Sequence, residues 1–178
     1  MSDETVDKRR HGNHNSPPVS IWGAVAGGFV GTLVLTSVLR AASELGLTRI
    51  DLPFLLGTAF TKDRVRAKAL GYALHFIAGQ LFALIYFAAF SAIGHSGFLL
   101  GALFGLLHGV FSSTALVNIL LPVVHPRMGT PFSAADSQPL LEPPGFLMRN
   151  YGSRTPFVTI VAHVAYGAIV GGFIALAS

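Results

Sequence analysis

Glycine recurs at every fourth position in the apolar stretch Gly97-Phe98-Leu99-Leu100-Gly101-Ala102-Leu103-Phe104-Gly105-Leu106-Leu107-His108-Gly109. In water this would be a poor helix, because glycine loses more backbone entropy on folding than other residues. In a bilayer the backbone must satisfy its own hydrogen bonds, so an apolar run of this kind is helical. Its glycines leave one bare face that a second helix can approach closely. The stretch therefore predicts a transmembrane helix built for close packing.

The composition of the whole chain agrees with this interpretation. Of 178 residues, 52% are hydrophobic and only 11% are charged, whereas a soluble domain carries about 25% charged residues. The chain has no cysteine, which excludes disulfides, thiolate metal sites and cysteine nucleophiles. The net charge is +4, but the basic residues flank apolar segments. We therefore expect them to anchor the chain at the lipid surface rather than to bind nucleic acid.

Four apolar segments are long enough to cross a bilayer, which needs about 20 residues. They predict an all-α protein, a bundle of four transmembrane helices at about 19–39, 69–93, 98–124 and 157–177. Residues 1–18 are polar and predict a disordered tail, and residues 19–178 form a single membrane domain. The short turn 94–97 makes the second and third helices an antiparallel hairpin. A proline-rich loop covers residues 125–156.

The Lys and Arg distribution predicts an orientation. The N-terminal tail carries three of these residues and the two long loops carry nine. Basic loops remain in the cytoplasm, so we expect both long loops there and both termini outside.

The two halves of the chain resemble each other. His75-x-x-x-Gly79 lies in the second predicted helix and His163-x-x-x-Gly167 lies in the fourth. Because these helices run in the same direction, a duplication would relate two helical hairpins by an axis along the membrane normal. Chance similarity between glycine-rich helices is the alternative.

Small residues mark one face of each predicted helix. The helix-packing glycines are Gly23, Gly27, Gly31, Gly79, Gly97, Gly101, Gly105, Gly109, Gly167 and Gly171. At 100° per residue, His75, His108 and His163 lie on these faces, and Tyr86 shares the face of His75. An ionisable group at membrane depth is a candidate functional site.

Two interpretations of these histidines are open. His75 and His163 lie at a similar predicted depth, about 10 Å below the loops, so they could hold a haem or a quinone between their helices. Alternatively, they are neutral polar core residues that hydrogen-bond carbonyls or hydroxyls across helix contacts. We expect His108 to lie about 12–15 Å away along the membrane normal, which argues against a three-histidine site. No intramembrane carboxylate accompanies them, and we predict no metal site.

The loops carry three further candidate residues. Asp51-Leu52-Pro53 predicts the start of a short helix with Asp51 as its N-cap. His125-Pro126-Arg127 follows the third helix. It predicts a helix stop, with a contact between Arg127 and a lipid headgroup as the alternative.

These features favour a non-enzymatic membrane protein whose glycine faces mediate helix packing and association with a second copy or another membrane protein. We expect the lipid bilayer as its surroundings, no nucleic acid, no catalytic residues and no required cofactor. One alternative is a small redox protein that binds haem or quinone between His75 and His163. The other is a minimal oligomeric transporter or channel.

Several short motifs also resemble those of a known family. They are Asp51-x-Pro53-x-x-Leu56-Gly57, His75-x-x-x-Gly79, His125-Pro126-Arg127-Met128, Pro144-Gly145-Phe146 and Ala162-His163-x-x-Tyr166-Gly167. Together they are similar to a family of small bacterial four-helix integral membrane proteins of unknown function. The resemblance implies a bacterial inner (cytoplasmic) membrane and shared structural roles for these residues. It implies no activity.

Overall fold

The computed structural model describes residues 21–129 and 141–178. The elements in chain order are α1 (Ile21–Glu44), α2 (Leu52–Thr58), α3 (Arg64–Ile93), α4 (Phe98–Phe111), the π-helix η1 (Ser112–Leu120), α5 (Leu121–Val124), the 3₁₀ segment η2 (Phe146–Tyr151) and α6 (Thr155–Leu176). Four helices, counting α4, η1 and α5 as one, are long and apolar enough to cross a membrane. The predicted all-α bundle of four transmembrane helices is therefore confirmed. The predicted N-terminal tail, residues 1–18, lies outside the described residues.

Two of the four long helices begin earlier than predicted. α3 begins at Arg64 rather than at residue 69, because Asp63 is its N-cap. The Oδ1 atom of Asp63 accepts a hydrogen bond from the Arg66 amide at 2.7 Å. α6 begins at Thr155 rather than at residue 157, with Pro156 in its first turn, a position that proline tolerates because no intrahelical donor is needed there. α3 and α6 therefore place His75 and His163 further from the loops than the sequence suggests.

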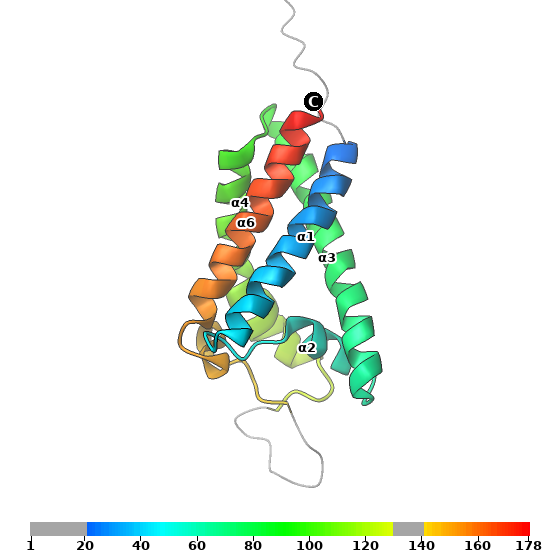
Figure 1. The fold of residues 1–178 in the computed structure, drawn as a ribbon, viewed down its shortest axis with the longest axis vertical. Helices are drawn as coiled ribbons and strands as arrows, with labels where there is room; N and C mark the ends of the chain where they lie inside the picture. The colour runs from blue at the N-terminus through cyan, green and yellow to red at the C-terminus, as the bar shows by residue number, and fades with distance from the viewer. Residues whose placement is uncertain (1–20, 130–140) are drawn as a thin grey trace, which may run out of the picture.

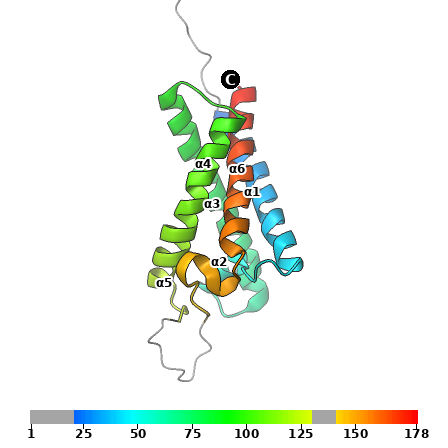
Figure 2. The ribbon, with the colours of Figure 1, turned by 90° about the vertical axis from the view of Figure 1, so that its left-hand side faces the viewer.

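The four long helices form a ring that is closed by helix contacts on three sides and open on the fourth. Figure 1 shows the four helices from the side. α1 and α6 pack along each other, α3 packs against α1, and α4 packs against α6. α3 and α4 are joined by a short turn, yet they have almost no backbone contact with each other. A two-fold repeat would pair α3 with α4 as it pairs α1 with α6. One of the four sides of the ring therefore departs from that symmetry (Figure 2).

Glycines bring the helices of the closed sides together. A Cβ atom added to Gly101 would collide with the carbonyl oxygen of Gly167, and one added to Gly105 would collide with that of His163. The remaining predicted packing glycines inside helices also face a neighbouring helix of the same chain: Gly23, Gly27 and Gly31 face α6, Gly79 faces α1, Gly109 and Gly171 lie in the α4–α6 contact.

Gly97 plays a different part from the one predicted. It precedes α4 as the N-cap, with φ 155° and ψ 168°, and a Cβ atom added to it would meet open space. The stretch in fact begins with a turn, for which this left-handed φ requires glycine. Gly97 therefore belongs to the hairpin turn, while its carbonyl oxygen still lies in the α4–α6 contact, where a Cβ atom added to Gly171 would collide with it.

The third transmembrane segment changes its winding at η1. Pro122 has no amide hydrogen, and its ring would clash with the carbonyl four residues before it. The amide of Leu121 bonds the carbonyl of Leu116, five residues back, which is the π-helical pattern. The hydroxyls of Ser113 and Thr114 also bond carbonyls four residues back, at 2.8 and 2.7 Å, and such bonds bend helices.

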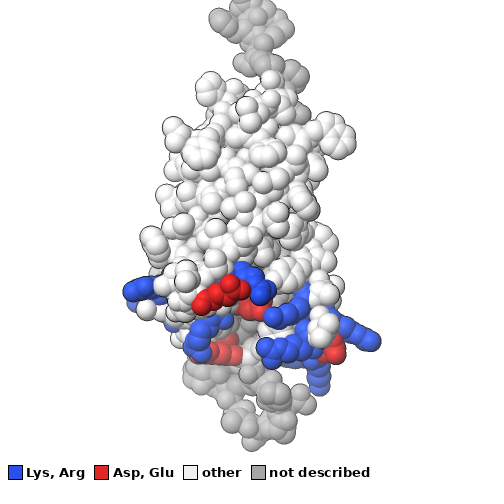
Figure 3. All heavy atoms as spheres, viewed as in Figure 1, with Lys and Arg blue, Asp and Glu red and all other residues white. Residues whose placement is uncertain are grey.

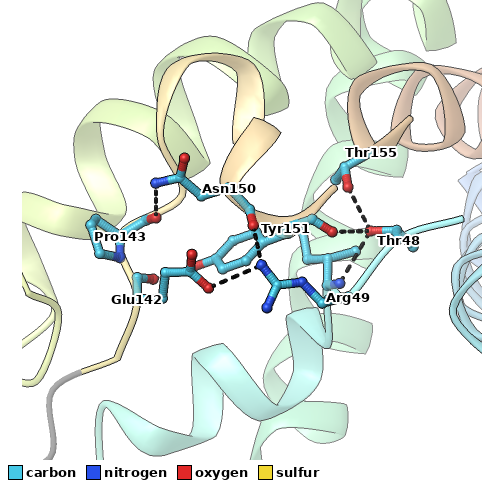
Figure 4. Close-up of polar contacts among 8 residues, drawn as sticks. Thr48, Arg49, Glu142, Pro143, Asn150, Tyr151 and Thr155 are labelled. Carbon is cyan, nitrogen blue, oxygen red and sulfur yellow. Dashed lines mark hydrogen bonds and ion pairs between the residues drawn. The ribbon is translucent and has the colours of Figure 1, made fainter. Parts of the chain in front are cut away.

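All charged side chains among the described residues belong to one end of the molecule, where the two connectors lie (Figure 3). There the connectors are tied together (Figure 4). The hydroxyls of Thr48 and Thr155 lie 2.7 Å apart, the amide of Arg49 donates to the Tyr151 carbonyl at 2.6 Å, and the Tyr151 hydroxyl donates to the Glu142 carbonyl at 2.7 Å. These bonds fix the start of α6 against the segment that follows α1.

Candidate functional site

A cavity of about 280 Å³ lies inside the bundle, between α1, α3, η1 and α6. Most of its wall is apolar, and leucines of α1, the α2 region and η1 form the part nearer the charged end. Its polar wall residues are Thr32, His75, His108, Ser112, Thr159, His163 and Tyr166. The cavity wall is thus mostly apolar, with a small number of polar groups.

The structure brings all three predicted membrane histidines to this cavity. The ring centroids of His108 and His163 lie 4.7 Å apart, with the rings at 76°. The expected separation of His108 from His163 was therefore wrong. The expected depths were counted from the predicted starts of the second and fourth helices, whereas α3 and α6 begin earlier in the chain. The contacts of Gly101 with Gly167 and of Gly105 with His163 set the true register, which places His108 level with His163.

Hydrogen bonding differs among the three rings. His163 Nδ1 lies 2.8 Å from the Thr159 carbonyl. Because a carbonyl has no hydrogen to give, Nδ1 carries the proton, and the neutral ring keeps a lone pair on Nε2. His108 Nδ1 lies 3.4 Å from the hydroxyl of Tyr86. The Tyr86 ring does not line the cavity but closes the bundle beside it.

His75 is the exception. It is 8% exposed, and its Nε2 has no hydrogen-bond partner among the described residues. The hydroxyl of Thr159, which is 4% exposed and also lines the cavity, has none either. Burying such groups without a partner is costly. The polar core interpretation therefore fits His108 and His163, whereas His75 and Thr159, which also line the cavity, each keep a buried polar atom without a partner among the described residues.

The open side of the ring is divided in two along its length. On the half away from the charged end, aromatic side chains fill the space between α3 and α4: Phe82 stacks on His108 at 3.8 Å, and Phe90 meets Phe104 at 4.9 Å. Beyond His108, towards the charged end, the cavity takes their place. Its wall there includes Leu120 and Val124, which are 50% and 62% exposed on the outside of the bundle. The cavity therefore reaches the lipid-facing surface beside η1 and α5.

The loop candidates do not line the apolar cavity; they stabilise the connectors at the charged end of the molecule. Asp51 caps α2, and its Oδ1 accepts from the Phe54 amide at 3.0 Å. His125 follows α5, and its Nε2 lies 3.0 Å from the Leu55 carbonyl. The guanidinium of Arg127 donates to the carbonyls of Thr58 and Thr61 at the end of α2. In this position Arg127 caps a helix C-terminus, a role that neither sequence interpretation included.

The sequence predicts the Thr159 hydroxyl as one of several hydrogen-bond partners of the histidines, but it does not predict the π-helix. Thr159 lies one turn before His163, so helical spacing could have placed it beside that ring. Pro122 signals a disturbed helix, although not its π-helical form. Among the described residues no group of three His, Asp or Glu side chains is arranged to hold a metal ion.

Comparison of the chain with models of protein families, with curated proteins and with solved structures gave no match. The fold and the cavity therefore carry the functional argument, and the family resemblance stays a prediction.

Proposed function

We propose that this membrane protein binds a lipid-soluble molecule with a polar ring, of the quinone class, in the cavity between α1, α3, η1 and α6. The observation that carries the proposal is the pair of buried, unpartnered polar groups in an apolar cavity, His75 Nε2 and Thr159 Oγ1. Ligand sites are mostly apolar, with a few polar groups that orient the ligand. A ring carbonyl would accept a hydrogen bond from the Thr159 hydroxyl, or from His75 Nε2 when that nitrogen carries the proton.

The route from the lipid supports the same class of ligand. The cavity reaches the outside beside Leu120 and Val124, so an apolar tail could extend into the bilayer while the ring lies inside. A haem fits less well. The edge-to-face contact of His108 with His163 at 4.7 Å leaves no room for a porphyrin between those two rings, so a haem would have to use His75.

Association through glycine faces receives less support. Those of the predicted glycines that lie inside helices contact other helices of the same chain, so they do not provide a surface for a second molecule. For the location of the protein, the charges at one end (Figure 3) support an inner-membrane orientation with the connectors in the cytoplasm.

Binding of decylubiquinone to the purified protein in nanodiscs tests the proposal. We expect saturable binding to the wild type. Thr159→Val removes one hydrogen bond and should weaken binding about three- to tenfold, since such a bond contributes about 1 kcal/mol.

Thr114→Val is the matched control. Thr114 lies on η1, its hydroxyl bonds a carbonyl of its own helix, and it does not line the cavity. Its affinity for the quinone should equal that of the wild type. Absence of saturable binding, or an equal loss in both variants, would contradict the proposed function.

A further inference from the structure

A second cavity, of about 190 Å³, lies between α1, the start of α2 and α3. In contrast to the first, its wall is rich in polar groups. They are Thr36, Arg40, Ser43, Glu44, Asp51, Lys68, Tyr72 and His75. The side chains of Arg40, Glu44, Asp51 and Lys68 are 44–66% exposed, so this cavity opens at the charged end of the molecule.

The two cavities meet at a small set of residues. Both are lined by Leu39, Ile50, Leu52 and His75. Three of these are aliphatic and His75 alone can carry a proton, so the imidazole is the polar element of the partition. It is also the ring with an unpartnered, buried Nε2.

We infer that the second cavity is a water-filled vestibule through which protons reach His75 from the charged end of the molecule. An imidazole can take up a proton at one ring nitrogen and release one at the other, so His75 can exchange protons between the vestibule and the apolar cavity. Delivery of such a proton to a bound ligand rests on the proposed function. The vestibule itself does not depend on it.

The charges around His75 favour one side for this exchange. Through the vestibule the ring faces Arg40 and Glu44 of α1, Asp51 before α2, and Lys68 and Tyr72 of α3. Arg40 pairs with Glu44 at 3.0 Å, and Lys68 pairs with Asp51 at 3.5 Å. The vestibule mouth therefore carries balanced charge and presents no net electrostatic barrier to a proton.

On the other side, the titratable groups that line the apolar cavity are uncharged residue types with hydrogen-bond partners. Through the apolar cavity these are His108 of α4, and His163 and Tyr166 of α6. Tyr166 donates to the Gly79 carbonyl at 2.5 Å, and His163 is bonded to the Thr159 carbonyl. Within residues 21–129 and 141–178, no charged side chain lines that cavity, so this part of the chain offers protons no comparable route to His75 from there.

Deuterium exchange at the histidine Cε1 position, measured by mass spectrometry on the wild type in nanodiscs, tests the inference. Exchange requires water at the ring. His163 is the internal control, because it is as buried as His75, 6% against 8% exposed, but lines only the apolar cavity. We expect His75 to exchange several-fold faster. Equal rates at the two rings would overturn the inference.

A matched pair of cysteine variants links this exchange to the vestibule. The chain has no native cysteine. Thr36 lines the vestibule, whereas its neighbour Ser37 is exposed on the outside of α1 at nearly the same depth. The hydroxyls of both bond carbonyls of α1.

Because a charged methanethiosulfonate reagent reacts with the thiolate, which requires water, we expect Thr36→Cys to react at least about tenfold faster than Ser37→Cys. The modification at position 36 should then slow His75 exchange. Equal reaction rates at the two positions would overturn the inference.

The wild-type measurement decides the question alone if Thr36→Cys does not fold. Failure of decylubiquinone to bind would remove the proposed function and leave the exchange result unchanged. Equal exchange at His75 and His163 would remove the vestibule and leave quinone binding unchanged. The two ideas can therefore fail separately.

Discussion

Thr159→Val should stabilise the protein when no ligand is bound. The Thr159 hydroxyl is buried in an apolar wall without a partner, and burial of an unsatisfied polar group costs about 1–3 kcal/mol. Valine has the same shape and is equally β-branched, so the substitution removes the polar atom without a large change in packing. Because polar interactions in membranes average about 0.6 kcal/mol, we expect a gain of about 1 kcal/mol in the free energy of unfolding.

Thr155→Val is the matched control, one turn earlier on the same helix. Thr155 is as buried as Thr159, but its hydroxyl lies 2.7 Å from that of Thr48. Removal of this bond leaves the Thr48 hydroxyl short of a partner, and we expect a loss of about 1 kcal/mol. The same chemical change should thus have opposite signs at the two positions.

Reversible unfolding in mixed detergent micelles, followed by circular dichroism, measures both variants. A lower unfolding free energy for Thr159→Val than for the wild type would refute the reasoning, because it would mean that the hydroxyl has a partner. Shifts of the same sign in both variants would refute it as well.

Three further predictions concern the helix bundle and the connectors at its charged end. Gly105→Ala should lower the unfolding free energy by about 2 kcal/mol, because the new methyl group meets the His163 carbonyl across the α4–α6 contact and close packing tolerates little extra volume. Gly172→Ala is the control: a Cβ atom meets open space there, so the substitution should be neutral or slightly stabilising. A similar loss in both variants would contradict the packing model. Arg127→Gln should increase amide deuterium exchange in α2, whose last carbonyls Arg127 caps, and unchanged exchange would show that the cap is not needed. Burial and the nearby Glu142 charge raise the pKa of Tyr151 to about 12, so its contribution to stability is complete below about pH 10 and is lost as the pH rises towards 12. This loss, measured by thermal unfolding against pH, should be smaller in Tyr151→Phe than in the wild type, and an equal loss in the two proteins would contradict the burial of Tyr151.

Much of the fold could be predicted from the sequence because a bilayer leaves the backbone few options. Apolar length identifies the four long helices, and Asp51-Leu52-Pro53 identifies the start of α2. The start of α3 is predicted five residues too late, because the charged residues Arg64, Arg66 and Lys68 are typical of a loop between membrane helices. Their long side chains can reach the surface while their backbone is helical.

The site could be predicted only in part. Helical periodicity places His75, His108 and His163 on inward faces, but depth depends on the register between helices. Pairing the glycines of α4 with Gly167 and Gly171 would have given that register. The cavity itself depends on where side chains fail to fill space between α3 and η1, which periodicity cannot reveal.

Photolabelling with a quinone that carries a diazirine on its ring tests the central claim most directly. The protein would be irradiated in nanodiscs, and the labelled residues of α3 identified by mass spectrometry. We expect labels at Ala78 and Phe82, which line the cavity, and their loss when excess decylubiquinone is added. Labels only at Ile77 and Leu81, which are 56% and 57% exposed on the lipid face of the same helix, would contradict it.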